Sequence, residues 1–204
     1  MIVERPADAW CLYVCAHGAG AGMRHPFLAA LCRALGALGV ATLRYEFPYM
    51  ESRQKRIDPP AVLHARVREA VAAARAQGLP LFAGGKSMGG RMTSQAQASE
   101  PLPGVRGIAF VGFPLHPARK PSVDRAAHLA RVQVPMLFLQ GTRDELADLE
   151  LLQGVLRPLS LATLRIFDDA DHSFQVRKKS GRTAAQVIVE LALAFTEWAR
   201  PLTR

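Results

Sequence analysis

Short apolar runs alternate with amphipathic segments along most of the chain. The run 9–16 is almost continuously apolar, which is typical of a strand buried on both faces of a parallel sheet. Leucines recur at helical spacing over the next segment, 28–38. We therefore expect an α/β fold with about six mostly parallel strands and helices on both faces. The strands are predicted at 9–16, 40–45, 81–83, 105–111, 134–139 and 162–167.

Several of the predicted helices carry recognisable ends. Pro26 suits the first turn of the leucine-rich helix. Asp58 is expected to cap a helix that begins one or two residues later. Thr183 and Gln186 form a capping box in front of the last helix. Further helical segments are expected over 145–156 and, as a short piece, near 125–131.

Length and composition favour a single α/β domain over residues 1–204, since 50% of the residues are hydrophobic and no repeat or linker interrupts the pattern. The apolar stretch 187–195 is interrupted by Glu190 and is too short to span a bilayer. Residues 1–10 carry two acidic side chains and no apolar core of the signal-peptide type. A cytoplasmic protein without membrane contact is therefore expected.

The net charge of +9 comes mainly from arginines that are scattered through the predicted helices. Solvated helical faces explain such scattering better than nucleic-acid binding, which we do not expect; an anionic substrate stays open. The three cysteines form no C-x-x-C pair and are expected to be reduced thiols in apolar surroundings. Cys15 and His17 resemble half of a metal site, but no second cluster completes it, so neither metal nor organic cofactor is expected.

The candidate catalytic residues closely follow the predicted strands. Gly85-Lys86-Ser87-Met88-Gly89 follows the strand at 81–83 and has the G-x-S-x-G pattern of a nucleophile elbow, a tight turn from strand to helix. Glycine is needed two residues before and after the serine, because the neighbouring chain comes too close for a side chain. Asp144 and His172 follow later strands, so the order is Ser, Asp, His.

At this point the chain resembles the α/β-hydrolase superfamily over about residues 10–200. It is most similar to the small lidless branch that includes bacterial dienelactone-hydrolase-like proteins and the hydrolase-like domain of testis-expressed and chromatin-complex proteins. The pattern offers no counterpart of that family's first two strands and no cap domain. The motifs that carry the resemblance are Ala16-His17-Gly18-Ala19-Gly20, Gly85-Lys86-Ser87-Met88-Gly89-Gly90-Arg91, Gly141-Thr142-Arg143-Asp144-Glu145-Leu146 and Asp171-His172-Ser173-Phe174.

These residues suit a serine hydrolase that cleaves a carboxylic ester or thioester. Ser87 is expected to be the nucleophile, His172 its base, and Asp144 the group that orients the imidazole. Backbone N–H groups of Met88 and of Ala19 or Gly20 would hold the oxyanion. The expected pocket rim consists of His17, Arg24, His25, Lys86, Arg91, His116 and Arg143.

Each of these residues has a plainer alternative. Ser87 could cap a helix, His172 could be a solvated loop histidine, and Asp144 could cap the helix expected near Glu145. His17 is more often a residue that orients a loop. Alternative acids for the histidine are Asp168, Asp169 and Asp171.

Other protein classes fit less well. Gly85-Lys86-Ser87 resembles the end of a phosphate-binding loop, but Pro80 stands where its first glycine belongs. The glycines at 18, 20 and 22 do not complete G-x-G-x-x-G, because position 23 is Met23. The remaining alternative is a catalytically weak or inactive hydrolase-like binding module.

Overall fold

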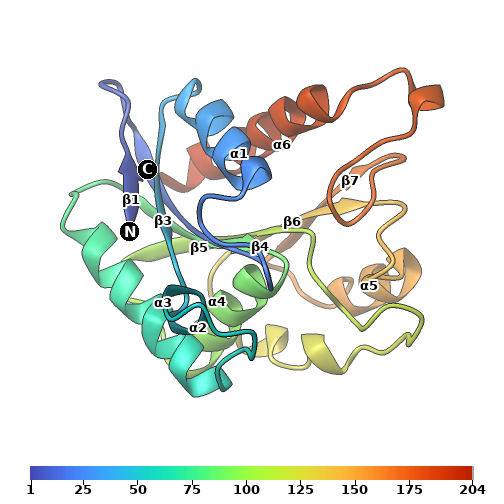
Figure 1. The fold of residues 1–204 in the computed structure, drawn as a ribbon, viewed down its shortest axis with the longest axis horizontal. Helices are drawn as coiled ribbons and strands as arrows, with labels where there is room; N and C mark the ends of the chain where they lie inside the picture. Colours follow the sequence, from blue (N-terminus) through green and yellow to red (C-terminus); the bar gives the residue numbers. More distant parts are fainter. Residues whose placement is uncertain (204) are drawn as a thin grey trace.

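One seven-stranded sheet, with strand order β1-β3-β2-β4-β5-β6-β7, runs through the middle of the fold (Figure 1). The structure is a computed structural model that describes residues 1–203. All neighbouring strands are parallel except β1, which pairs antiparallel with β3. The strands are β1 (Ile2–Glu4), β2 (Cys11–Ala16), β3 (Val40–Tyr45), β4 (Leu81–Lys86), β5 (Val105–Val111), β6 (Met136–Gly141) and β7 (Ala162–Phe167).

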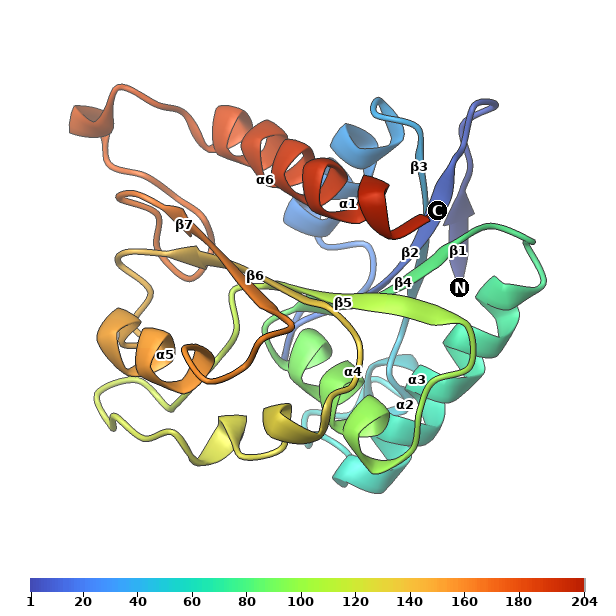
Figure 2. The ribbon, with the colours of Figure 1, turned by 180° about the vertical axis from the view of Figure 1, so that it is seen from behind.

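Helices cover both faces of this sheet, as Figures 1 and 2 show. α1 (Pro26–Gly36) and α6 (Ala184–Ala199) pack on one face. The other face carries α2 (Pro48–Glu51), α3 (Pro60–Arg75), α4 (Met88–Ser99) and α5 (Leu149–Leu156).

The core is divided by the sheet into two apolar clusters. Along β2, Leu12 and Val14 face the cluster under α3 and α4, while Tyr13 and Cys15 face the cluster under α1 and α6. All six residues of β2 are buried, and so are all six of β3. Burial on both faces explains why the sequence shows continuous apolar runs here instead of an alternating pattern.

The six predicted strands are all present, and the sheet has one strand more. β1 was not predicted, because two of its three residues are exposed at the edge of the sheet and show no apolar run. β4 continues through Lys86, so the strand reaches the residue before Ser87. The capping box of Thr183 and Gln186 is confirmed at the start of α6.

One predicted helix cap and one predicted helix start are wrong. Asp58 does not cap α3, whose cap residue is Pro59; its carboxylate instead accepts the backbone N–H of Tyr49 at 2.7 Å. α5 begins at Leu149, later than expected, and Asp148 caps it by accepting the N–H of Leu151 at 3.0 Å. The short piece expected near 125–131 is two 3₁₀ turns, Asp124–Ala126 and Leu129–Arg131.

The direction in which the chain adds strands to the sheet reverses at β2. From β2 the chain passes to β3 on one side, and then returns to place β4 on the other side. The loops that follow β2 and β4 therefore lead away from each other at the carboxyl ends of these strands, which is where ligands bind in open parallel sheets. Those two loops carry His17 and Ser87.

All three cysteines are free and buried, as predicted. Across residues 1–203, we find no helix with the length and apolar character needed to cross a bilayer.

A buried histidine makes the stability of this fold pH-dependent. His128 Nε2 lies 2.7 Å from Ser94 Oγ on α4, and burial lowers the pKa of His128 to about 4. Because the unfolded chain takes up a proton near the ordinary value of about 6.5, acid favours unfolding between these two values. We expect this one group to remove about 2 kcal/mol of the free energy of unfolding as the pH falls from 6.5 to 4.5.

Denaturant titrations of the native chain and of His128→Gln over this pH range measure the contribution. The native free energy of unfolding should fall more steeply with acid than that of the variant. His25→Gln, which replaces an exposed histidine, is the control and should keep the native slope. Equal slopes for the native chain and His128→Gln would contradict the prediction.

Candidate active site

Ser87 occupies a strained turn between β4 and α4. Its φ is 51° and its ψ is −119°, a conformation that costs a non-glycine residue about 1–3 kcal/mol. The turn is held on both sides, since the N–H of Ser87 donates to Val111 O at 3.1 Å and its carbonyl accepts the N–H of Arg91 at 3.2 Å. The surrounding backbone therefore fixes a serine that could not hold this geometry alone.

The glycines of the G-x-S-x-G pattern are needed for close approach, as predicted. A Cβ on Gly85 would lie 2.2 Å from Ala16 O, and one on Gly89 would lie 2.5 Å from His17 O. Both positions press against the end of β2 and the loop that follows it. Gly84, which the pattern does not include, is tighter still, because its Cβ would lie 1.9 Å from Ala109 O on β5.

The imidazole of His172 reaches the serine from the loop after β7. His172 Nε2 lies 2.9 Å from Ser87 Oγ, and Nδ1 lies 2.7 Å from Asp144 Oδ2. A carboxylate can only accept, so Nδ1 carries the proton and Nε2 is free to accept the proton of Ser87. The structure thus brings together the three side chains that the sequence singled out.

Asp144 is buried in the loop after β6 and uses both carboxylate oxygens. Oδ1 accepts the backbone N–H of Leu146 at 2.8 Å, while Oδ2 accepts from His172 and from Gln140 Nε2 at 2.6 Å. The capping role considered for Asp144 belongs to Asp148 instead. The alternative acid Asp171 stabilises its own loop by accepting the N–H groups of Ser173 and Gln175 at 2.8 and 2.9 Å.

Gln140 contacts the candidate site and was not singled out from the sequence. It is fully buried on β6, and its amide bridges two loops: Nε2 donates to Asp144, and Oε1 accepts the N–H of Phe113 at 2.9 Å. A lone glutamine in an apolar strand is the only sequence signal, and that signal does not identify its partners. In the structure, Gln140 fixes the orientation of the carboxylate that faces His172.

Replacing Gln140 with methionine is expected to lower kcat about 10-fold while KM changes little. The variant keeps the size of the side chain but loses a hydrogen bond to a charged group, which is worth about 1.5–3 kcal/mol. Steady-state kinetics on p-nitrophenyl acetate would measure the loss.

Gln97→Met is the matched control for this prediction. Gln97 is also buried and accepts a backbone N–H, that of Leu102 at 2.7 Å, but it lies far along α4 from Ser87. Both variants should lose about 1–3 kcal/mol of stability through an unpaired buried N–H group. Only Gln140→Met should lose kcat, and equal kinetics in the two variants would refute the orienting role.

The groups expected to hold an oxyanion surround the same serine. Met88 is the first residue of α4, so its N–H has no acceptor within the helix. On the other side, a Cβ on Gly18 would lie 3.6 Å from Ser87 Cβ, and Ala19 and Gly20 follow directly in that loop. The use of these N–H groups as donors stays a prediction.

Two residues expected at the pocket rim are buried and support loops. His17 accepts the N–H of Phe47 at Nε2 (3.0 Å), and its Nδ1 lies 2.8 Å from Gly18 O; burial lowers its pKa. His116 accepts the N–H of Asp148 at Nε2, at 2.8 Å. Both side chains are occupied by backbone partners, because neighbouring loops cover them in a way that the sequence does not show.

The other expected rim residues lie in different environments. Arg24 and His25 are exposed, Arg91 is partly buried on α4, and Arg143 donates to Asp169 O at 3.0 Å. Lys86 is partly buried and contacts the loop of His172.

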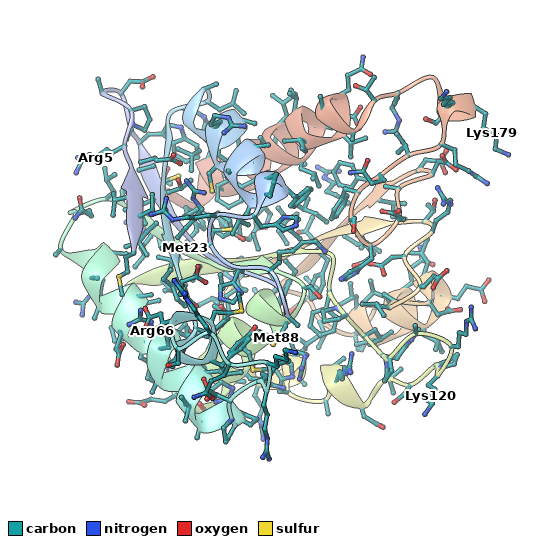
Figure 3. The ribbon with its side chains drawn as sticks, in the orientation of Figure 1. Arg5, Met23, Arg66, Met88, Lys120 and Lys179 are labelled. Carbon is teal, nitrogen blue, oxygen red and sulfur yellow. The ribbon has the colours of Figure 1, made fainter. Side chains whose placement is uncertain are left out.

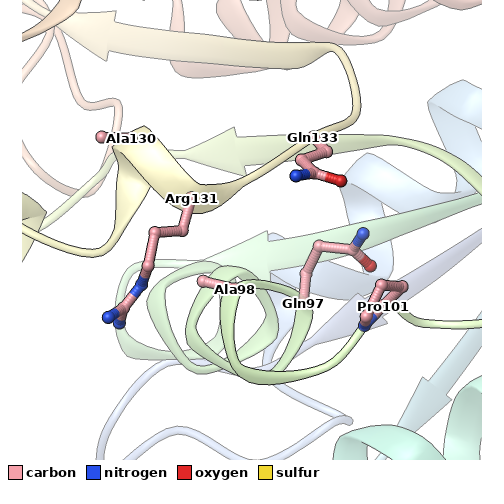
Figure 4. Close-up of a pocket in the computed structure, with 6 residues that line it drawn as sticks. All are labelled: Gln97, Ala98, Pro101, Ala130, Arg131 and Gln133. Atoms are coloured by element: carbon pink, nitrogen blue, oxygen red, sulfur yellow. The ribbon is translucent and has the colours of Figure 1, made fainter.

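A cavity of about 290 Å³ is lined in part by His172 and its loop. Its lining residues are Arg143, Glu145, Leu146, Asp171, His172 and Ser173. Another cavity, of about 370 Å³, lies between the end of α4 and the turn at 129–131 (Figure 4). Gln97 lines that cavity ten residues after Ser87, about 15 Å along the helix, so the cavity is remote from the serine.

No metal-binding group of three or more His, Cys, Asp or Glu occurs within residues 1–203.

The fold and this arrangement define a hydrolase of the α/β class. A sequence profile of the family described as "Alpha/beta hydrolase domain" matches residues 10–200, and the chain belongs to that family. It is a small, lidless member, because the strands and helices of residues 1–203 include no separate cap domain.

Solved structures with the same fold cover nearly the whole chain. A dienelactone hydrolase from Anabaena variabilis matches with a TM-score of 0.74 and 22% identity, over 99% of this chain and 91% of the other. An α/β serine hydrolase without a lid from Xanthomonas campestris gives 0.71 and 21%, over 96% and 87%. The esterase domain of a Rhodothermus marinus protein gives 0.68 and 19%, over 98% and 91%.

Proposed function

We propose that this chain is a serine hydrolase that cleaves a carboxylic ester or thioester through an acyl-enzyme. The observation that carries the proposal is the continuous hydrogen-bonded chain from Ser87 Oγ through both nitrogens of His172 to Asp144 Oδ2. Because a neutral serine hydroxyl is a weak nucleophile, it needs a neighbouring base that is itself held in the right tautomer. The names of the esterase and dienelactone hydrolase neighbours agree with this reaction class.

In the first half of the reaction, Ser87 Oγ bonds to the acyl carbon while its proton passes to His172 Nε2. The negative charge that develops on the former carbonyl oxygen is stabilised by the N–H groups of Met88 and of Ala19 or Gly20. The bond to the leaving oxygen or sulfur then breaks, and Nε2 returns the proton to it. Asp144 remains ionised and stabilises the imidazolium.

Water completes the cycle. It attacks the acyl carbon and gives a proton to His172 Nε2, and the bond to Ser87 breaks as that proton returns to Oγ.

The helix α4 also contributes to stabilising the oxyanion. It begins at Met88, so the positive end of its dipole lies next to the oxyanion.

The cavity beside His172 suits a small substrate. Its volume of about 290 Å³ lies at the lower limit of ordinary ligand pockets, which measure about 300–1,000 Å³. Arg143 on its wall gives a positive group that could face an anionic substrate, although Glu145 and Asp171 also line it. We propose a small acyl compound as the partner, with no role for nucleic acid or a membrane, and a cytoplasmic location.

Activity-based labelling tests the proposal. The native chain should react covalently with a fluorophosphonate probe and hydrolyse p-nitrophenyl acetate, and Ser87→Ala should do neither. Labelling that persists in Ser87→Ala would refute the role of Ser87. A native chain that is folded but neither labels nor turns over ester would instead indicate an inactive hydrolase-like binding module.

A further inference from the structure

Lys86, the residue before the serine, makes a contact that the reaction described above does not use. Its side chain leaves the end of β4 and donates from Nζ to the backbone oxygen of His172 at 2.6 Å. The same Nζ lies 5.7 Å from the centre of the Phe174 ring. Lys86, which precedes the proposed nucleophile Ser87, is therefore hydrogen-bonded directly to the backbone of the proposed base His172.

The fold leaves room for this contact at Gly112, after β5. A Cβ on Gly112 would lie 3.1 Å from Lys86 Nζ and 3.5 Å from His172 Cε1, and the φ of +71° also favours glycine there. A Cβ at this position would crowd the ammonium group of Lys86 and would make ordinary van der Waals contact with the imidazole. The glycine thus provides the space in which Lys86 and His172 meet.

Keeping an ammonium group here is unfavourable for the fold. Burial lowers the pKa of Lys86 to about 8, even though Asp144 and Asp171 act in the opposite direction. A lowered pKa means that the folded chain binds this proton less tightly than the unfolded chain, so the charged form opposes folding at neutral pH. Such a cost is typical of a residue that is retained for function and not for stability.

We propose that Lys86 is a positioning residue that holds the backbone of His172 within reach of Ser87; this rests on the proposed hydrolase function. Within the His172 loop, Asp171 accepts the N–H groups of Ser173 and Gln175. The loop is also tied to the loop after β6, because Arg143 N–H donates to Ala170 O at 2.9 Å and His172 bonds to Asp144. Lys86 links it to the strand that carries the serine. The bond thereby couples the 2.9 Å separation of Ser87 Oγ and His172 Nε2 to the end of β4.

Lys86→Met separates positioning from simple support of the fold. Methionine keeps a flexible side chain of similar length but has neither the charge nor the N–H donor. We expect kcat on p-nitrophenyl acetate to fall about 10- to 100-fold with little change in KM, because small misplacements of a base are costly. The free energy of unfolding should stay equal or rise, because the buried charge is removed. A purely structural contact would instead lower stability.

Hydrogen exchange adds a readout that does not depend on turnover. Amides of the loop 170–175 should exchange several-fold faster in Lys86→Met, and Lys86→Arg should restore part of the protection and of kcat. Lys179→Met is the control, because Lys179 is exposed at the tip of the molecule (Figure 3), and it should match the native chain throughout.

Unchanged kcat and exchange in Lys86→Met would overturn the proposal. So would a loss of kcat accompanied by an equivalent loss of stability. Failure of the native chain to react with ester or fluorophosphonate would refute the hydrolase function alone, since the exchange comparison would still measure the contact between Lys86 and the loop.

Discussion

Ser87→Ala should lower kcat on p-nitrophenyl acetate by about 10⁴- to 10⁶-fold, the largest kinetic effect we expect from this chain. The alanine removes the atom that forms the acyl-enzyme, while the N–H groups near the oxyanion remain. Ser87 Oγ bonds only to His172 among the hydrogen bonds described, so stability should change little. Single-turnover kinetics would measure the loss of rate, fluorophosphonate labelling would test for the loss of the nucleophile, and denaturant titration would check that stability is unchanged.

The chain offers a matched control in a second pair of serine and histidine. Ser94 Oγ lies 2.7 Å from His128 Nε2, and Ser94 sits two turns after Ser87, on the same helix. This pair lacks the features of a reactive one. Arg91 and Arg131 act with burial to lower the pKa of His128 to about 4, which makes it a poor base at neutral pH. Ser94→Ala should therefore keep kcat within about 2-fold of the native value.

Combining substitutions tests whether Ser87 and His172 act as one unit. If proton transfer between them is part of one step, the double variant Ser87→Ala/His172→Ala should be no slower than the slower single variant. Additive losses would mean that the two side chains contribute separately. That result would contradict the proposed mechanism even if both single variants were nearly inactive.

The loops that carry chemistry could be predicted from the sequence because each follows a buried strand. Apolar runs mark the strands, and parallel strands bring their carboxyl ends to one edge of the sheet. Ser87, Asp144 and His172 could therefore be grouped although 85 residues separate the first from the last. The glycines around Ser87 added a local constraint that only a close backbone approach explains.

What the sequence did not show depends on contacts between distant segments. Gln140 and Lys86 act through single hydrogen bonds whose partners lie on other loops, and no periodicity encodes such a pair. The loop contacts that bury His17 and His116 were not predicted, because these contacts come from neighbouring loops and not from their own strands. β1 was missed because an edge strand of three residues needs no apolar pattern.

Gly85→Ala is expected to destabilise the fold by about 3 kcal/mol or more, the largest stability effect among these predictions. The new Cβ would lie 2.2 Å from Ala16 O and 2.6 Å from Ala16 N, and the φ of +144° is unfavourable for alanine in any case. Backbone on β2 cannot move aside without breaking the pairing of Ala16 with Gly85 between the two strands. Denaturant titration would report the loss of free energy.

Gly154→Ala should have the opposite sign. Gly154 lies exposed inside α5, and its added Cβ would meet nothing within 4 Å, so alanine should raise the free energy of unfolding by about 0.5–1 kcal/mol. The comparison separates close backbone approach from the general effect of replacing glycine. Because the clash at Gly85 involves the strand that leads to Ser87, the variant should also lose kcat under conditions where it remains folded. If Gly85→Ala instead kept native stability and native kcat, the packing of β4 against β2 could not be what holds the serine in its strained turn.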